Sequence, residues 1–401
     1  MPDIAIVGGL YVEHCIQPLW SAVYGSAGRA AQCITSLIDG KISLYGYVAT
    51  EIQKEVESLA LDCEAILIPA SSSQAICFDY LHPLSTPIIS PAISRIAANN
   101  AIEVNADIVL RYGMLEGDAV TRSRLAVYDP QSAFNVRRFS DNGSRAEALA
   151  IVMNRYEARA MTGIGDPSEA AKSLIRSGEA VVVIVKMGSQ GALVVTPDRT
   201  EFVPIYETER VWKIGSGDVF SATFAALWAC QAMSAVEAAD LASRATAYYC
   251  QNRSSPSPSV DELRKMDNRP CHLTNGTVYL ASPFFDLGQR WLVEEARSIL
   301  QSLGAQVFSP VHAVGPGPAS IVAPEDIKGL ESSDVVFAVL NGLDTGTIFE
   351  IGYAVKKGIP VVALAQNVKP EDLKMIEGTK CEVVDDFVSA AYRTIWRLPK
   401  I

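Results

Sequence analysis

A carboxylate set among apolar residues stands near the C-terminal end of the sequence. Glu350 belongs to the run NGLDTGTIFEIGY at residues 341–353, between Phe349 and Ile351. A carboxylate that is partly desolvated but held ionised is a usable nucleophile toward an electrophilic sugar carbon. The same place near the start of a helix also suits an ordinary glutamate that the helix dipole favours. The residue types alone leave both interpretations open.

The elements around Glu350 are predicted to be a strand, a tight loop and a helix. Residues 332–340 (SSDVVFAVL) are apolar and rich in β-branched residues, which predicts a buried strand. The Gly, Asp and Thr residues at 342–347 break that pattern, and Asp344 is a suitable cap for the helix that follows. Ligands of an open α/β sheet bind at the carboxyl ends of its strands, so this loop is a candidate site.

Four ordered segments make the last third of the sequence resemble the nucleoside 2-deoxyribosyltransferase family, which includes N-glycoside hydrolases of nucleosides and nucleotides. The segments are YLASPFF at 279–285, VFSPVH at 307–312, SDVVFAVL at 333–340 and DTGTIFEIGYA at 344–354. The resemblance implies that Glu350 is the nucleophile and that Tyr279 helps to position it. It also implies that Asp344 and Asp334 hold and protonate the departing base.

The C-terminal part is expected to be a flavodoxin-like (Rossmann-type) α/β domain. Its predicted order is β-α-β-loop-α-β-α-β, and residues 290–303 form an amphipathic helix within it. Ser282 and Phe284 follow the first strand and are candidate substrate contacts, although Phe284 suits core packing equally well. The resemblance implies a homo-oligomer, because such domains commonly complete their sites across subunits.

A second group of residues suited to chemistry lies at 214–224, in the run IGSGDVFSATF. Gly215, Ser216 and Gly217 form a turn before a helix that is predicted to begin at Asp218. Backbone N–H groups at such a helix start hold anions. Asp218 can accept the proton of a hydroxyl that attacks a phosphoryl group, or it can simply cap the helix.

The Gly-Ser-Gly-Asp turn resembles the G-A-G-D signature of the ribokinase-like (PfkB) sugar and nucleoside kinases, and the resemblance covers about residues 1–262. Asn154 and Glu157 match the family's N-x-x-E motif, and Glu13 stands where the family has an acid that grips substrate hydroxyls. The resemblance implies ATP and Mg²⁺ as cofactors, with Mg²⁺ near Glu157. It makes Asp218 the base and the residues 215–217 the cradle for the phosphoryl group.

Several residues depart from the kinase pattern. Glu13 replaces the usual Asp, Tyr24 and Arg29 replace a Gly and an Asn, and Trp212 with Lys213 replaces an Asp-Thr pair. These departures predict an unusual acceptor, or a domain that binds a ligand without phosphorylating it. Arg29 and Lys213 suit an acceptor that already carries negative charge, but both are expected to be solvated surface residues.

The composition of the 401 residues excludes several classes of partner. Hydrophobic residues make up 49%, charged residues 20%, and the net charge is −11, which argues against nucleic acid and anionic membranes. No apolar run approaches a membrane span, and no signal peptide is recognised. The eight cysteines are scattered and the four histidines show no metal-ligand spacing, so free thiols in a cytoplasmic protein without a dedicated protein-bound metal are expected.

The run NRSSPSPS at residues 252–259 is the best candidate linker. We expect residues 1–266 to form a ribokinase-like parallel-sheet sandwich with a small lid, and residues 267–401 to form the flavodoxin-like domain. The expected function is bifunctional: ATP-dependent phosphorylation of a nucleoside or sugar, and cleavage or transfer of an N-glycosidic bond. The alternative is a glycosidase controlled by a catalytically inactive kinase-like domain, and a weaker one is a pair of binding modules. The expected ligands are nucleosides, nucleotides or pentoses.

Overall fold

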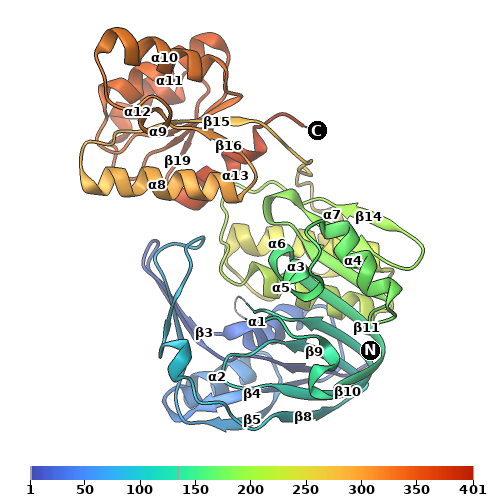
Figure 1. Cartoon of the computed structure of the whole chain (residues 1–401). Helices are drawn as coiled ribbons and strands as arrows, with labels where there is room; N and C mark the ends of the chain where they lie inside the picture. Colours follow the sequence, from blue (N-terminus) through green and yellow to red (C-terminus); the bar gives the residue numbers. More distant parts are fainter. Residues whose placement is uncertain (1, 133–134, 401) are drawn as a thin grey trace. The chain divides into compact units, whose positions relative to one another are not determined.

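The computed structural model describes residues 2–132 and 135–400 (Figure 1). The chain forms two compact units, Met1–Pro270 and Cys271–Ile401. Within the described ranges, none of the helices combines the length and the apolar character needed to cross a bilayer.

The first unit is built on a large sheet, which has ten strands among the described residues, in the order β14-β13-β12-β11-β10-β9-β1-β4-β5 with β8 beside β10. All pairs are parallel except β12–β13 and β13–β14. The strands are β1 Ile4–Val7, β4 Ile42–Ala49, β5 Ile66–Ser72, β8 Ile102–Asn105, β9 Ile108–Tyr112, β10 Ala119–Asp129, β11 Arg145–Asn154, β12 Val182–Lys186, β13 Ala192–Val195 and β14 Thr200–Val203. The β-branched runs of the sequence thus form buried strands of a mostly parallel sheet.

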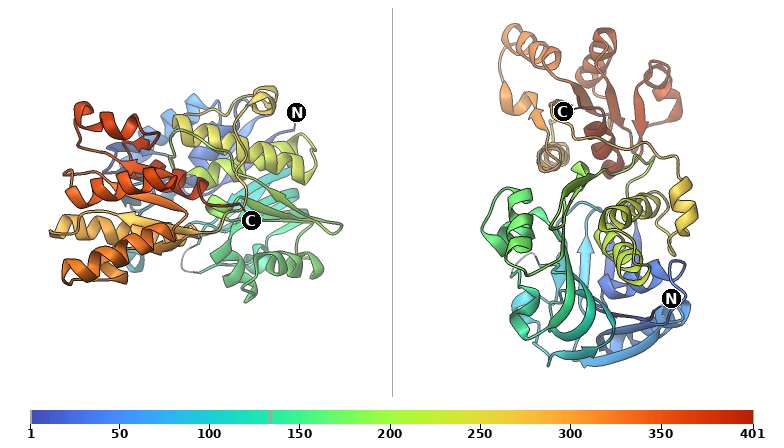
Figure 2. Two further views of the ribbon diagram at one scale, coloured as in Figure 1. Left: turned by 90° about the horizontal axis from the view of Figure 1, so that it is seen from above. Right: turned by 90° about the vertical axis from the view of Figure 1, so that its right-hand side faces the viewer.

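Helices cover both faces of this sheet (Figure 2). One face packs against α1, α2, α5 and α6, and the other against α3 and α4. The helices are α1 Gly25–Ile34, α2 Gln53–Asp62, α3 Arg155–Thr162, α4 Pro167–Arg176, α5 Ser216–Ala225, α6 Ala235–Asn252 and α7 Val260–Lys265. A π-helical segment, Ala226–Cys230, continues α5, which itself begins at Ser216, two residues before the predicted start at Asp218.

A second, smaller sheet, here called the lid sheet, has the strand order β3-β2-β6-β7. Its strands are β2 Val12–Cys15, β3 Trp20–Val23, β6 Cys77–Tyr80 and β7 Ile88–Ser90. The chain turns at residues 16–19 after β2 and returns as β3. Pro18 lies in that turn, where a residue without an N–H group does not interrupt a ladder.

The second unit is a five-stranded parallel sheet in the order β16-β15-β17-β18-β19. The strands are β15 Thr277–Ala281, β16 Gln306–Phe308, β17 Val335–Val339, β18 Val361–Leu364 and β19 Glu382–Val384; the helices are α8 Leu287–Ser302, α9 Pro310–Ala313, α10 Ala319–Glu331, α11 Thr345–Lys357, α12 Pro370–Glu377 and α13 Phe387–Trp396. Helices α10, α11 and α12 pack on one face, while α8 and α13 contact the other. This is the flavodoxin-like order, whose topological switch point lies between β15 and β17.

Candidate active sites

Glu350 meets Tyr279 at the switch point of the second sheet. Tyr279 Oη donates a hydrogen bond to Glu350 Oε1 at 2.5 Å. Tyr279 is fully buried on β15, and its ring stacks on Phe308 with 5.5 Å between the ring centroids. Glu350 lies in the second turn of α11 and is half-buried. A rigid phenol therefore fixes the carboxylate beside the edge of the sheet where ligands bind.

The surroundings of Glu350 raise its pKa to about 7. Burial is the largest cause, the charges of Asp326 and Asp344 add to it, and the hydrogen bond from Tyr279 acts in the opposite direction. Burial and the nearby Glu350 raise the pKa of Tyr279 as well, so the phenol keeps its proton and stays the donor. At neutral pH the carboxylate is divided between two protonation states, whereas the sequence interpretation assumed that it is held ionised.

Asp326, on α10, belongs to this cluster although the sequence analysis did not single it out. Its charge acts on both Glu350 and Tyr279, and burial raises its own pKa. Its Oδ1 is buried without a hydrogen-bond partner among the described residues. In the sequence, Asp326 stands four residues after Val322 and four before Leu330. This spacing puts it on the face of the helix that packs against the sheet. A carboxyl group whose pKa is raised is a candidate proton donor to a departing base.

The two aspartates predicted beside the base lie in different places. Asp344 caps α11, because its Oδ2 accepts hydrogen bonds from Thr347 N at 2.8 Å and Thr347 Oγ1 at 3.1 Å. Asp334 precedes β17 at the amino edge of the sheet, where its Oδ2 accepts from Thr277 N at 2.8 Å. The structure therefore brings Asp344 close to Glu350 and leaves Asp334 outside the cluster.

The predicted substrate contacts follow β15 at the carboxyl edge of the sheet. Ser282 is half-buried, and its hydroxyl donates to the carbonyl oxygen of Pro283 at 3.1 Å. The ring of Phe284 lies 5.2 Å from that of Phe285, and Arg290 Nε donates to the carbonyl oxygen of Phe284 at 3.0 Å. Both residues lie at the same edge as the loop before α11, and their contact with a substrate stays a prediction.

A cavity of about 350 Å³ lies in the first unit between the lid sheet and the start of α5. Its volume falls in the range of small-molecule pockets. The walls combine lid-side residues with the Gly-Ser-Gly-Asp turn, and they include Tyr11, Glu13, Phe78, Tyr80, Ile89, Gly215, Gly217 and Asp218. The structure therefore brings the predicted Glu13 and Asp218 together at one pocket.

Arg29 joins these two carboxylates. It pairs with Glu13 through both terminal nitrogens, and its Nη1 donates to Asp218 Oδ2 at 2.9 Å. Its Nε donates to the hydroxyl of Tyr249 at 3.1 Å. Burial opposes its charge, but Glu13, Tyr249 and Asp218 outweigh burial and raise the pKa of Arg29. The residue is only 1% exposed, so its expected place on the solvated surface is wrong.

The guanidinium group lies over the turn that was predicted to cradle a phosphoryl group. Gly215 has φ +74°, and a Cβ atom built there would lie 2.1 Å from Arg29 Nε. Only glycine fits that backbone and that approach. The pKa of Asp218 is raised by burial, with Arg29 acting against it. In this state the guanidinium of Arg29 is paired with Asp218, the group that an attacking hydroxyl would meet. Lys213 lies beside the same turn, where its Nζ donates to Ser216 Oγ at 2.8 Å.

Asn154 and Glu157 form the cap of α3. Asn154 Oδ1 accepts from Glu157 N at 2.9 Å, and Glu157 Oε2 accepts from Asn154 N at 2.7 Å. Burial, followed by the charge of Asp129, raises the pKa of Glu157 to about 7. Asp129 and Lys186 end β10 and β12 at this edge, and Lys186 Nζ lies 2.6 Å from Asp129 Oδ2. Sequence reasoning missed both, because only the sheet brings them beside Glu157.

These residues fit the cofactors that a kinase domain implies. Asp129 Oδ1 is buried without a partner among the described residues, and carboxylate oxygens are the ligands Mg²⁺ prefers. A Cβ atom at Gly217 would lie 3.5 Å from Lys186 Nζ, so the lysine stands beside the start of α5 where a phosphate would bind. Residues suited to Mg²⁺ and phosphates are present, and Arg29 pairs with the aspartate that would act as the base.

Comparisons with known proteins agree with both halves. Residues 278–385 match the family model "Nucleoside 2-deoxyribosyltransferase", and residues 128–262 match "pfkB family carbohydrate kinase". The chain thus combines a domain of the PfkB ribokinase family with a C-terminal nucleoside 2-deoxyribosyltransferase domain. No curated protein matches the chain.

Several solved structures are similar to the first unit. A nucleoside kinase of the ribokinase family from Methanocaldococcus jannaschii is 15% identical, with 66% of this chain and 97% of that chain covered and a TM-score of 0.51. A fructokinase from Vibrio cholerae, bound to fructose, ADP and calcium, is 16% identical over 66% of this chain and 98% of its own, with a TM-score of 0.48. At 15% identity, the likeness to the nucleoside kinase shows the ribokinase-like fold and not the substrate.

Proposed function

We propose that the C-terminal unit breaks the N-glycosidic bond of a nucleoside or nucleotide through a covalent glycosyl-Glu350 intermediate. The observation that carries the proposal is the hydrogen bond from Tyr279 Oη to Glu350 Oε1 at 2.5 Å, at the switch point of the sheet. A half-buried carboxylate with a pKa of about 7 at this edge of the sheet suits a nucleophile that works near neutral pH.

The reaction then has two displacements at C1′. Glu350 forms a bond to C1′ while the C1′–N bond breaks, and the base leaves with the electron pair and takes a proton from Asp326. Water or a second base next attacks C1′ and gives its proton to the Asp326 carboxylate while the C1′–O bond to Glu350 breaks, which restores both residues and completes hydrolysis or transfer. Tyr279 holds the attacking oxygen in line but remains protonated throughout. Asp326 suits the acid role because its Oδ1 is buried and burial raises the pKa of the carboxyl group.

The direct test is release of free base from a panel of ribonucleosides, deoxynucleosides and their 5′-phosphates. Glu350→Gln keeps the size of the side chain and removes the nucleophile, so we expect the rate to fall by about 10³-fold or more. Glu377→Gln, an exposed site at the end of α12, is the matched control and should keep the wild-type rate. Undiminished base release by Glu350→Gln would dismiss the proposal. Adding a second free base to the same assay separates hydrolysis from transfer.

For the first unit, the contacts of Arg29 favour a ligand-binding domain over an active kinase. We propose that its pocket binds a sugar or nucleoside that carries an anionic group, with Arg29 as the partner of that group. A neutral alcohol has no means of displacing a cation that is paired with both Glu13 and Asp218. The bifunctional alternative requires Arg29 to leave Asp218 during turnover.

Two measurements separate these alternatives for the first unit. ATP consumption by the wild-type protein with neutral pentoses and nucleosides should not exceed that of Asp218→Asn. Wild-type turnover that Asp218→Asn abolishes would instead support an active kinase. Calorimetric titration with sugar phosphates and nucleoside monophosphates should show binding that Arg29→Ala weakens at least about tenfold, since a charged hydrogen bond contributes roughly 1.5–3 kcal/mol. Equal affinity for neutral and phosphorylated ligands would contradict the role of Arg29.

A further inference from the structure

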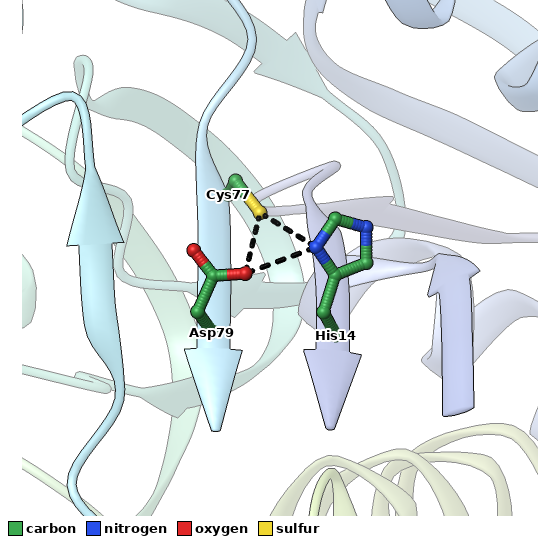
Figure 3. A group of neighbouring side chains, drawn as sticks. All are labelled: His14, Cys77 and Asp79. Atoms are coloured by element: carbon green, nitrogen blue, oxygen red, sulfur yellow. Dashed lines mark hydrogen bonds and ion pairs between the residues drawn. The ribbon is translucent and has the colours of Figure 1, made fainter. Parts of the chain in front are cut away.

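Three residues of the lid sheet bring a nitrogen, a sulfur and an oxygen atom together outside the pocket (Figure 3). His14 lies on β2 and Cys77 and Asp79 lie on β6, and the two strands pair in parallel with His14 opposite Asp79. Neighbouring residues of a strand point to opposite faces, so Glu13, Phe78 and Tyr80 face the cavity while the three lie on the other face. The cluster is thus separate from the cavity but built on the same two strands.

The distances between the three atoms are close to the distances between ligand atoms in a tetrahedral zinc site. His14 Nδ1 lies 3.0 Å from Asp79 Oδ1 and 3.4 Å from Cys77 Sγ, and Cys77 Sγ lies 3.6 Å from Asp79 Oδ1. Zinc bonds of about 2.0–2.3 Å at tetrahedral angles separate their ligand atoms by about 3.3–3.7 Å. Binding an ion therefore requires shifts of a few tenths of an ångström and no change in strand pairing.

We propose that His14, Cys77 and Asp79 bind one divalent ion of the zinc class on the outer face of the lid sheet. Imidazole and thiolate select borderline-soft ions over Mg²⁺ and Ca²⁺, which prefer oxygen ligands alone. The side chains of His14 and Asp79 are 46% and 39% exposed, which leaves the fourth position to water or an added ligand. The spacing of residues in the sequence does not reveal the site, because the histidine stands more than sixty residues before the Cys-x-Asp pair.

Binding is coupled to the loss of one proton. Burial, followed by the charge of Asp79, raises the pKa of Cys77 to about 11, so the thiol is protonated in the absence of metal. The ion replaces that proton: the S–H bond breaks, an S–metal bond forms and H⁺ enters solvent.

The ion would also connect the pocket walls. It ties β2, which carries Glu13, to β6, which carries Phe78 and Tyr80, so binding should stiffen the lid sheet and raise the thermal midpoint of the full chain. This inference stands apart from the proposed glycosidase, because its residues belong to the first unit and its readout is metal binding.

The experiment is a titration of the chelator-treated full-length protein with Co²⁺ and then with competing Zn²⁺. We expect one Co²⁺ per chain with a thiolate charge-transfer band, displaced by Zn²⁺ but not by excess Mg²⁺. Cys77→Ser should remove the band and lower the Zn²⁺ affinity at least about 100-fold, since losing only an outer partner costs 10–100-fold. Asp79→Asn should keep the band and lower the affinity, which guards against a folding defect in the first variant.

The matched control is Cys381→Ser, which removes the other half-buried thiol. It should bind Co²⁺ like the wild type. The proposal fails if the wild type binds no Co²⁺ at micromolar concentration, in which case the three side chains form a hydrogen-bonded cluster only. It also fails if the band survives Cys77→Ser or disappears in Cys381→Ser.

Discussion

The hydrogen bond between Tyr279 Oη and Glu350 Oε1 bears directly on whether Glu350 is charged. In the proposed reaction Glu350 needs its negative charge to attack a sugar carbon, yet burial and two acidic neighbours raise its pKa to about 7. The hydrogen bond from Tyr279 is the contact that acts in favour of the charged form. Since the pKa of Glu350 lies near neutrality, activity should rise with pH as the carboxylate ionises and should be lost below about pH 6.

Tyr279→Phe tests that contact. Without the hydrogen bond, the pKa of Glu350 rises further, so the acidic limb of the kcat/KM profile should move to higher pH. A hydrogen bond to a charged group contributes roughly 1.5 kcal/mol, which predicts a move of about one pH unit. The matched control is Tyr353→Phe. Tyr353 lies on α11, as Glu350 does, but its hydroxyl donates a hydrogen bond to Glu331, so its loss should leave the profile unchanged. A Tyr279→Phe profile that falls in height without moving would contradict the electrostatic role.

Asp326→Asn tests the proton donor. General acid catalysis contributes about 10²–10⁴-fold, so release of adenine or another base that needs a proton should slow by that factor. A 7-methylguanine nucleoside already carries a positive charge on its base, and its release should be almost unaffected. Glu325→Gln, the exposed neighbour on α10, is the matched control. Equal losses with both leaving groups would show that Asp326 acts in another way.

At the scale of elements, the loop before α11 both caps the helix and sets the charge beside Glu350. Asp344 accepts from Thr347 N and also raises the pKa of Glu350. The two effects separate by substitution, because Asn caps a helix as well as Asp does, whereas Ala does not.

We therefore expect Asp344→Asn to keep the stability and to move the acidic limb of activity to lower pH, because a negative charge near Glu350 is gone. Asp344→Ala should make the same pH change and also lower the free energy of unfolding by about 1 kcal/mol. Urea unfolding and kcat/KM profiles measure the two effects. Equal destabilisation by both substitutions would show that the cap is not what holds the start of α11.

Local patterns in the sequence predicted most of the helices and strands but not the contacts between distant segments. The run before Asn341 forms β17 and the run after it forms α11, because apolar spacing and capping residues act within a few positions. Arg29 and Asp326 were misjudged or missed because their environment comes from distant segments. Asp218 lies 189 residues from Arg29, and only the assembled sheet brings that charge into contact. The helix and strand propensities of single residues contain no information on contacts between residues so far apart in the sequence.

At the scale of the molecule, each unit has a hydrophobic core of its own. The large core of the first unit includes Ile6, Leu44 and Phe224, whereas Val336 and Ala354 belong to that of the second. We expect calorimetry to show two unfolding transitions, of which Asp344→Ala lowers only one. A single cooperative transition shifted as a whole would contradict this. The expected homo-oligomer stays a prediction, which light scattering can measure.

The most direct test of the account is acid quenching of the full-length protein during turnover, followed by mass spectrometry of its peptides. A covalent mechanism predicts a pentosyl adduct on the peptide that contains Glu350, formed together with the first equivalent of free base and absent from Glu350→Gln. Base release without any adduct on that peptide, or with an adduct on another residue, would contradict the claim that Glu350 is the nucleophile.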